Sequence, residues 1–375
     1  MDDSALGSAA TDKDRHHASG AVLTIDLGAL AANYHLLRRR LAPARCGGVV
    51  KADAYGLGAS RVGPALFAAG CLEFFVAHLD EGIALRSHLP GSATIYVMHG
   101  VFEGGERECV AHDLVPVLNS PPQLTRWAAL ASALSRRLPA AIQLDTGMAR
   151  FGFDGDGAPA VPPSLDLDLV MSHLACADEP DHPANAAQLA AFTRLRATLP
   201  AAPASLVASS GIFLAPEFHH DLARPGAALY GVAPQPGRAF GLHPVIRLDA
   251  KIVQLRRVAA DTPIGYGHTA RTTAAATLAT IAVGYADGYL RSGSNHGSAW
   301  FGDTALPIMG RVSMDSIVLD ASAVPDGALQ EGSFVELIGP HRGVDAVAAD
   351  AGTIGYEVLT SLGRRYDRRY VGESV

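Results

Sequence analysis

The sequence has few of the features that mark secreted, membrane or nucleic-acid-binding proteins. Its 375 residues include 4 cysteines (Cys46, Cys71, Cys109 and Cys176), with no Cys-x-x-Cys pair and no metal-ligand spacing. A disulfide framework and a metal site are therefore not expected. Lys and Arg number 30 against 37 Asp and Glu, so the net charge of −7 offers no basic field for nucleic acid or anionic lipid. No apolar run approaches the roughly 18 to 20 residues of a membrane helix.

The first 20 residues are polar and lack the apolar segment of a secretory signal peptide. We predict a disordered leader over residues 1–20 and a cytoplasmic protein. Hydrophobic residues make up 49% of the sequence and charged residues 18%. This composition provides for a large core and excludes an intrinsically disordered chain.

Apolar runs alternate with amphipathic stretches over residues 21–243. Seven runs are typical of strands: Gly48–Lys51, Phe74–His78, Thr94–Met98, Val115–Leu118, Ala141–Asp145, Asp168–His173 and Ser205–Ser209. The stretches Ala29–Leu41, Asp80–His88, Gln123–Leu134 and Gln188–Leu199 are typical of helices. This alternation indicates βαβ units. We predict a (β/α)8 TIM-like barrel, with an open parallel sheet as the alternative.

The eighth strand has two candidate positions. Asp221–Arg224 stops at the turn signal Pro225–Gly226, and Ala227–Gly231 is the alternative. We favour Asp221–Arg224, because it places Arg224 at a strand end beside the loop after the seventh strand.

The pattern changes near residue 244, where a Pro- and Gly-rich connection ends. Short strands separated by Gly, Pro, Asp and Ser turns follow: Val245–Val258, Ala276–Val283, Ser298–Trp300, Ile317–Asp320 and Phe334–Ile338. Only Asp345–Ala351 has a helical pattern. We predict a separate, mainly antiparallel β domain over residues 244–375.

Lys51 is the first candidate for chemistry. It ends an apolar run and is followed by a turn that contains Gly56 and Gly58. Barrel enzymes hold catalytic groups at the C-terminal ends of their strands, and partial desolvation lowers the pKa of an amine enough to make it a nucleophile or base. The alternative is a solvated lysine just beyond a strand.

Other candidates follow later strands. Ser210 and the backbone N–H groups of Gly226 and Ala227 suit phosphate, which the loops after strands seven and eight of a barrel commonly bind. Arg150, after the fifth strand, is placed to meet a carboxylate or phenolate. Tyr285 lies in a Gly-flanked turn, where it could act as a general acid or base. Taken singly, each is better explained as an ordinary turn, a solvated arginine or a packed tyrosine.

Seven segments in one order resemble the alanine racemase family. They are Val49–Gly56 (VVKADAYG), Asp145–Arg150 (DTGMAR), Ser172–Ala175 (SHLA), Arg224–Gly231 (RPGAALYG), Gly284–Gly288 (GYADG), Gly310–Asp315 (GRVSMD) and Gly355–Val358 (GYEV). The likeness extends over residues 21 to about 370. It implies a pyridoxal 5'-phosphate enzyme built as a barrel followed by a β domain.

The resemblance also implies the reacting residues. Lys51 would form the aldimine with pyridoxal phosphate and act as one base, and Tyr285 would act as the opposite base. Arg150 and the Met314 N–H would meet the substrate. Tyr285 and Met314 would complete the site of the other subunit in a homodimer.

The positions that would bind the cofactor form a larger set by the same resemblance. They are Lys51, Tyr55, Arg150, His173, Ser210, Arg224, Gly226, Ala227 and Tyr356. Arg224 would face the pyridine nitrogen, and His173 would support the tyrosine base. A guanidinium keeps its proton, so that nitrogen would stay unprotonated, which favours reprotonation of the substrate carbanion over transamination or decarboxylation.

The implied reaction is the racemisation of L-alanine to D-alanine by two bases, supplying D-alanine for peptidoglycan. A broad-specificity amino-acid racemase and a non-catalytic pyridoxal-phosphate-binding protein are the alternatives. Three positions depart from the family pattern. Leu57 replaces a histidine, Gln143 replaces a lysine that is often carbamylated, and Ser209 replaces an asparagine.

Overall fold

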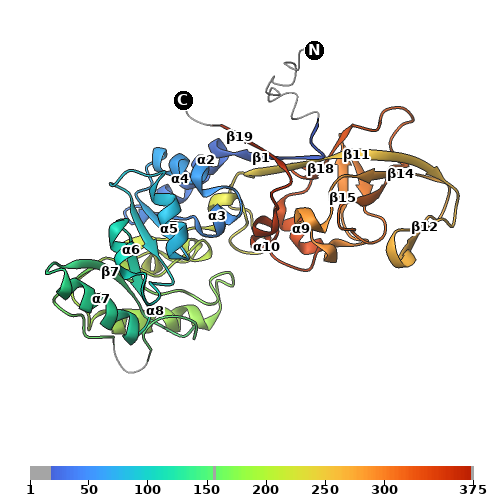
Figure 1. Ribbon diagram of the computed structural model, residues 1–375. Helices are drawn as coiled ribbons and strands as arrows, with labels where there is room; N and C mark the ends of the chain where they lie inside the picture. Colours follow the sequence, from blue (N-terminus) through green and yellow to red (C-terminus); the bar gives the residue numbers. More distant parts are fainter. Residues whose placement is uncertain (1–17, 155–157, 373–375) are drawn as a thin grey trace, which may run out of the picture. The chain divides into compact units, whose positions relative to one another are not determined.

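The computed structural model describes residues 18–154 and 158–372, which form two compact units (Figure 1). The barrel unit comprises Leu27–His243. The β-domain unit comprises residues 18–26 together with Pro244–Gly372. Each predicted site residue belongs to one of these two units.

A parallel sheet forms the centre of the barrel unit. Its strands pair in chain order: β3 (Gly48–Val49), β4 (Glu73–Val76), β5 (Thr94–Val97), β6 (Val115–Leu118), β7 (Leu138–Gln143), β8 (Leu165–Met171) and β9 (Ala204–Ser205). Neighbours in the chain are neighbours in the sheet because each connection returns to the next position. The prediction of a TIM-like barrel is confirmed.

Two short strands link the ends of this sheet. β10 (Leu222–Ala223) pairs in parallel with β2 (Arg45–Cys46), which continues into β3 after Gly47. A parallel bridge joins Ala208, just after β9, to Arg224, just after β10. The sheet therefore closes on itself, as a barrel requires.

The favoured position of the eighth strand is confirmed, because β10 lies within Asp221–Arg224. The alternative at Ala227–Gly231 is wrong. Residues Ala227–Tyr230 form the short 3-10 helix η3 instead. Pro225 carries no N–H for a sheet, and the Leu229 N–H donates to the Gly226 carbonyl at 2.8 Å, which turns the chain.

Helices alternate with these strands (Figure 1). They are α2 (Leu27–Leu41), α3 (Lys51–Tyr55), α4 (Ala59–Ala68), α5 (Leu79–Arg86), α6 (Glu106–Ala111), α7 (Pro121–Ala133) and α8 (Pro183–Arg196), with the 3-10 helices η1 (Ser210–Phe213) and η2 (Pro216–Phe218). In α2 the residues Leu27, Leu30, Tyr34, Leu37 and Leu41 are buried, a spacing of three and four that gives the helix one apolar face.

The β-domain unit is a mainly antiparallel sheet around the 13-residue strand β11 (Ile246–Val258). The other strands are β1 (Ala21–Asp26), β14 (Ala276–Ile281), β15 (Ser298–Phe301), β16 (Thr304–Pro307), β17 (Ile317–Asp320), β18 (Phe334–Ile338) and β19 (Asp367–Val371), with a small hairpin of β12 (Pro263–Ile264) and β13 (Ala270–Arg271). β11 is long enough to pair with β1, β18 and β14.

β1 corrects the predicted start of the barrel. The sequence analysis placed residues 21–26 in the barrel, but this strand pairs antiparallel with β11 and parallel with β19. An alternating apolar strand does not by itself reveal which sheet it joins. Of the predicted leader, residues 1–17 lie outside the described residues. No helix in the described part of the chain is long and apolar enough to span a membrane.

The β domain also contains more helix than predicted. α9 (Val344–Asp350) matches the one expected helix, but α10 (Gly355–Ser361) follows it, and η4 (Tyr266–His268), η5 (Tyr285–Asp287) and η6 (Arg291–Gly293) are short 3-10 turns. α10 is only 7 residues long, too short for an apolar period to stand out from the sequence.

Candidate active site

The predicted site residues of the barrel unit all follow strands. Lys51 comes after β3, His173 after β8, Ser210 after β9 and Arg224 after β10. Arg150 lies in the loop after β7. The C-terminal ends of parallel barrel strands meet at one edge, which is where barrel enzymes hold their active sites.

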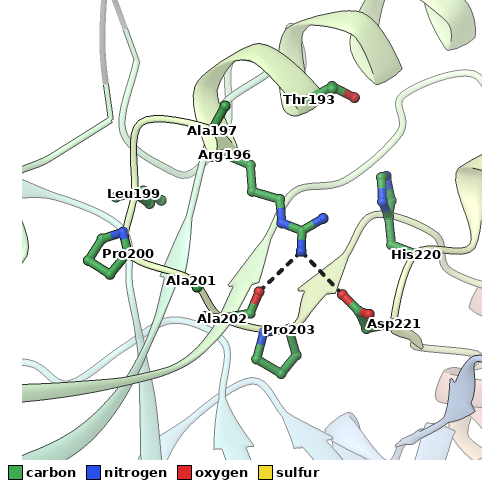
Figure 2. Close-up of a pocket in the computed structure, with 10 residues that line it drawn as sticks. All are labelled: Thr193, Arg196, Ala197, Leu199, Pro200, Ala201, Ala202, Pro203, His220 and Asp221. Carbon is green, nitrogen blue, oxygen red and sulfur yellow. Dashed lines mark hydrogen bonds and ion pairs between the residues drawn. The ribbon is translucent and has the colours of Figure 1, made fainter.

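A hollow of about 680 Å³ on the same unit lies at the opposite edge (Figure 2). Its lining includes Pro203 and Asp221, which precede β9 and β10. In it the Arg196 side chain donates to the Ala202 carbonyl at 3.2 Å and to the Asp221 carboxylate at 3.4 Å. This ion pair is partly exposed and holds a helix end to a strand start, so the hollow is a structural feature.

Lys51 opens an unusual turn. The next four residues, Ala52, Asp53, Ala54 and Tyr55, have φ values of 53°, 54°, 55° and 56°. This left-handed region costs a residue with a Cβ about 1–2 kcal/mol. Only then does Gly56 continue with φ of 81°. Strained backbone of this kind persists where the surroundings fix it, commonly at functional sites.

The Lys51 amine is half-buried in a positively charged neighbourhood. Burial and the nearby Arg150 guanidinium lower its pKa, and the Glu81 carboxylate raises it in part. The net effect is a pKa below the usual lysine range. A larger fraction of neutral amine is therefore present near neutral pH, as a nucleophile or base requires.

Arg224 is buried, with 2% of its surface exposed. It donates to the Ser205 hydroxyl and, at 2.6 Å, to the Ser172 carbonyl, and it lies 3.4 Å from His173 Nδ1. Burial lowers the pKa of Arg224 to about 9, so the guanidinium remains charged at neutral pH. None of these three partners is an anion, which leaves the charge free to act on a ligand.

His173 is neutral at physiological pH. Burial, followed by the charges of Arg224, Arg150 and Lys51, lowers the pKa of His173 to about 3. The imidazole therefore acts as a hydrogen-bonding group and contributes no cation to the site. Arg224, Arg150 and Lys51 all lie close enough to His173 to lower its pKa, so these four residues form one cluster.

Ser209 organises the loop after β10. Its hydroxyl accepts the N–H groups of Gly226 at 3.0 Å and of Ala228 at 3.1 Å. A Cβ at Gly226 would overlap the Tyr55 hydroxyl, so a larger residue here would displace the Tyr55 side chain. The Ala227 N–H between them has no acceptor among the described residues, although Ala227 is buried. The Gly226 N–H is thus occupied within the protein, and the Ala227 N–H is available.

Ser210 and Tyr55 lie beside this loop. The Ser210 hydroxyl donates to the Pro234 carbonyl at 2.6 Å. Tyr55 is buried, with its ring centroid 4.7 Å from that of Tyr230. The structure therefore gathers Tyr55, Gly226 and Ala227, and places Ser210 on η1 directly after Ser209.

Arg150 ends a loop that one carboxylate shapes. Asp145 Oδ1 accepts the N–H groups of Gly147 and Met148 at 2.9 Å and of Ala149 at 3.2 Å. Arg150 itself is exposed. Gln143 is buried within β7, and the described residues include no hydrogen bond between it and Arg150. Gln143 replaces a lysine that in the family is often carbamylated. In this structure its side-chain amide does not take over that support of Arg150 through a hydrogen bond.

Tyr285 lies in the β-domain unit on η5, a turn bounded by glycines. Its N–H donates to the Ser313 carbonyl at 2.9 Å, and the Ala286 N–H donates to the Met314 carbonyl at 2.9 Å. The Tyr285 and Met314 segments are thus held side by side. A Cβ on Gly284 would overlap the Ser313 and Met314 carbonyl oxygens, so only glycine allows this approach.

The Tyr285 and Met314 side chains are 40% and 53% exposed. Large side chains at this exposure are available to a ligand or to another chain. The Met314 N–H has no acceptor among the residues that the structure describes. Tyr356 is the second residue of α10, in the same unit.

An ion-pair network holds these two segments. Arg365 donates to both oxygens of the buried Asp287, at 2.6 and 2.8 Å, and to Asp315 at 2.7 Å. Asp287 in turn accepts the Gly284 N–H at 2.9 Å. One guanidinium therefore joins the turn that carries Tyr285 to the turn that carries Met314.

A lysine at the C-terminal edge of a closed parallel barrel, followed by an antiparallel β domain, is the arrangement expected from the resemblance to a pyridoxal-phosphate enzyme of two domains. The chain matches the family models for the alanine racemase N-terminal domain over residues 25–234 and C-terminal domain over residues 245–370. It belongs to the alanine racemase family.

Individual relatives agree. The chain is 54% identical to the catabolic alanine racemase of Mesorhizobium japonicum, over 95% of this chain and 94% of the relative. It is 49% identical to the alanine racemase of Brucella canis, over 96% and 95%. The crystal structure of alanine racemase from Bartonella henselae with covalently bound pyridoxal phosphate superimposes with a TM-score of 0.90 at 41% identity, covering 94% of this chain and all of that one.

The sequence analysis missed the groups that hold the predicted residues in place. Glu81 was only part of a helix, and Arg365 was not considered. Ser209 was noted only as a replacement, although its hydroxyl fixes the loop after β10. Nothing short of the folded chain joins Arg365 to a carboxylate 78 positions earlier.

Proposed function

We propose that this protein racemises alanine with pyridoxal 5'-phosphate as its cofactor, using Lys51 and Tyr285 as the two bases. The observation that carries the proposal is the cluster of Lys51, Arg150, His173 and Arg224 at one edge of the barrel, in a chain of the alanine racemase family. The lowered pKa of Lys51 suits both carbonyl capture and proton transfer.

The donors in the barrel unit fit a phosphorylated, anionic aldehyde. The buried Ala227 N–H lacks an acceptor among the described residues, and the Gly226 backbone lies against the Tyr55 hydroxyl where any Cβ would intrude. The Ser210 hydroxyl is in the adjacent segment. We assign the phosphate to these four residues, with Tyr356 of the β domain. The Ser210 hydroxyl would turn from the Pro234 carbonyl to donate to the phosphate, and Gly226, whose N–H is held by Ser209, would contribute its lack of a side chain. When bound, pyridoxal phosphate supplies the electron sink that makes the substrate α-hydrogen acidic.

Arg224 selects the reaction type in this proposal. Its guanidinium is buried among neutral partners and stays protonated at neutral pH. Such a group donates a hydrogen bond and gives up no proton, so a ring nitrogen opposite it stays unprotonated. By keeping that nitrogen unprotonated, Arg224 would make a bound cofactor a weaker electron sink, which would favour return of the proton to Cα over side reactions.

Proton transfer on two faces of the substrate requires two bases. Lys51 and Tyr285 lie on different units, each at an exposed or half-exposed position. We propose a homodimer in which the partner subunit contributes the tyrosine and the free Met314 N–H, the latter for the substrate carboxylate. Neutral His173 would support the tyrosine by a hydrogen bond.

The reaction is tested by chirally resolved D-alanine formation from L-alanine, with purified protein and pyridoxal phosphate. L-Serine, L-lysine and L-arginine are run in parallel. Conversion of alanine in strong preference to the others supports the proposal. Comparable turnover of lysine or arginine would instead establish a broad-specificity racemase, and bound cofactor without turnover would establish a non-catalytic binding protein.

The shared site is tested by mixing two inactive variants, Lys51→Ala and Tyr285→Phe, after dissociation and reassociation. In a shared site, half the dimers are mixed and one of their two sites has both bases, so about a quarter of wild-type activity returns. No recovery, with mixed dimers verified by mass spectrometry, would place both bases in one chain.

The physiological direction has two candidates. We propose that the enzyme supplies D-alanine for peptidoglycan in the cytoplasm. The catabolic name of the Mesorhizobium japonicum relative favours alanine breakdown as a second candidate. A deletion strain that requires D-alanine for growth supports the first, whereas a strain that fails only when one enantiomer of alanine is the sole nitrogen source supports the second.

A further inference from the structure

The left-handed turn after Lys51 is held by one side chain from a different element. Glu81 lies in the first turn of α5. Its Oε1 accepts the Ala52 N–H at 2.6 Å, and its Oε2 accepts the Ala77 N–H at 2.7 Å and the His78 N–H at 3.2 Å. A single carboxylate thus joins the residue after Lys51 to the chain between β4 and α5.

The turn is also tied by its own backbone: the Ala54 N–H donates to the Val50 carbonyl at 2.9 Å and the Gly56 N–H donates to the Ala52 carbonyl at 2.7 Å. Further along, the Gly58 N–H donates to the Asp53 carbonyl at 2.9 Å, and the Ala59 N–H donates to the Asp53 carboxylate at 2.7 Å. These bonds hold the end of the turn. Ala52 is the first left-handed residue, and its N–H bond to Glu81 fixes the backbone immediately next to Lys51.

We propose that Glu81 is a positioning residue for Lys51: its carboxylate holds the strained turn in the conformation that directs the lysine side chain. The inference rests on the proposed function, in which Lys51 binds the cofactor. Glu81 has no place among the proton carriers, since it acts through the Ala52 backbone.

A glutamine at position 81 distinguishes a side chain that must accept N–H groups from two segments from one that only contributes a surface charge. A glutamine amide has one oxygen and one NH2 group, so it cannot accept N–H bonds on both sides. In Glu81→Gln, either the Ala52 N–H or the N–H groups of Ala77 and His78 would therefore face the glutamine NH2 group and lose their acceptor. Glu81→Asp keeps the charge and shortens the reach. Asp80→Asn is the matched control, because Asp80 is the adjacent acidic residue in the same first helical turn and is exposed.

The first measurement uses cofactor-free protein. Amide hydrogen exchange at residues 52–55 is followed by mass spectrometry. We expect exchange to become about tenfold faster or more in Glu81→Gln and Glu81→Asp, since a charge-assisted bond is lost, and to stay at the wild-type rate in Asp80→Asn. Thermal unfolding of all three variants verifies that the barrel is folded.

The second measurement is competitive labelling of the Lys51 amine in the same proteins across pH. The chain has three lysines, Lys13, Lys51 and Lys251, so the labelled peptide is unambiguous. The Arg150 and Glu81 charges shift the pKa of this amine, and its own charge in turn lowers the pKa of His99 and His173. Glu81→Gln should lower the labelling midpoint, whereas Glu81→Asp, which keeps the charge, should preserve most of it.

The third measurement is cofactor binding. Affinity for pyridoxal phosphate should fall about tenfold or more in Glu81→Gln and remain unchanged in Asp80→Asn. If Glu81→Gln matches Asp80→Asn in exchange, labelling and affinity, the positioning role is wrong. If borohydride reduction of the wild-type protein with pyridoxal phosphate leaves Lys51 unmodified, the proposed function fails, and the two cofactor-free measurements still decide the role of Glu81 in the turn.

Discussion

The turns that carry Lys51 and Tyr285 are built in opposite ways. After Lys51, four residues with side chains adopt left-handed backbone, and the Glu81 carboxylate holds the first of them. Around Tyr285, glycines occupy the crowded positions, including Gly288 with φ of 91°, and ion pairs hold the turn. The turn after Lys51 is strained and is held by a hydrogen bond to its backbone. The turn that carries Tyr285 avoids strain by using glycines and is held by side-chain ion pairs.

Each turn is therefore sensitive to a different kind of substitution. A strained turn is weakened by loss of the group that holds it, and gains stability when the strain is relieved. A glycine turn is damaged by any added Cβ. Substitutions in the two turns should therefore separate these two behaviours.

Gly288→Ala should break the Tyr285 turn. Its Cβ would overlap the Ser361 carbonyl oxygen, and the positive φ adds strain. We expect turnover to fall more than about 100-fold through misplacement of Tyr285, with cofactor capture by Lys51 preserved. Steady-state kinetics and borohydride trapping measure the two effects. Gly332→Ala is the control, since φ is 89° there but the space is open; equal losses in both variants would contradict the account.

Arg365→Gln should loosen the link between the Tyr285 and Met314 turns. The buried Asp287 would lose its bidentate partner. We expect turnover to fall between about 10- and 100-fold and KM for alanine to rise, because both segments shift. Arg257→Gln, which removes an exposed pair with Asp326, should leave kinetics unchanged. Normal kinetics in Arg365→Gln would show that the glycines alone hold the turn.

His173 should make the barrel less stable in mild acid. Its folded pKa of about 3 lies below the unfolded value of 6.5, so the unfolded chain binds more protons between these values. The free energy of unfolding therefore falls as pH falls from 6.5 towards 3, by about 2 kcal/mol at pH 5. Urea unfolding of cofactor-free protein at pH 7 and pH 5 measures the loss. His173→Gln should remove this share of it, whereas exposed His88→Gln should not.

Ala52→Gly should have the smallest effect and the opposite sign. Glycine relieves the left-handed strain at φ of 53°, and we expect the free energy of unfolding to rise by about 1 kcal/mol. The same exchange at the exposed mid-helix residue Ala129 should lower it by about 1 kcal/mol. Denaturant melts of both variants give the comparison, and a loss of stability in Ala52→Gly would argue that the turn is unstrained.

The sequence contained enough to predict the barrel and the edge that carries Lys51, because both depend on local periodicity and on residues at strand ends. It did not contain the sheet that β1 joins, which long-range pairing with β11 and β19 decides. Nor did it reveal the long-range contacts that hold the two turns. Glu81 and Ala52 are 29 positions apart and Arg365 and Asp287 are 78 apart, and only the fold makes them neighbours.

The roles of Ser209, His173 and Arg224 likewise depend on contacts and burial that only the folded chain provides. Ser209, which replaces the family's asparagine, accepts two N–H groups with its hydroxyl and shapes the loop. Neutral His173 and charged Arg224 differ because burial disfavours both cations, and only the strongly basic guanidinium keeps its proton at neutral pH.

The central claim, that Lys51 and Tyr285 serve opposite faces of the substrate, is tested most directly by α-hydrogen exchange in D2O with Tyr285→Phe. Each enantiomer of alanine is supplied separately with cofactor present, and deuterium incorporation and inversion are measured together. The account predicts that one enantiomer still exchanges without inverting, through Lys51, while the other does not exchange and racemisation falls equally in both directions. Exchange of both enantiomers with inversion intact, or equal loss of exchange from both with cofactor still bound, would contradict it.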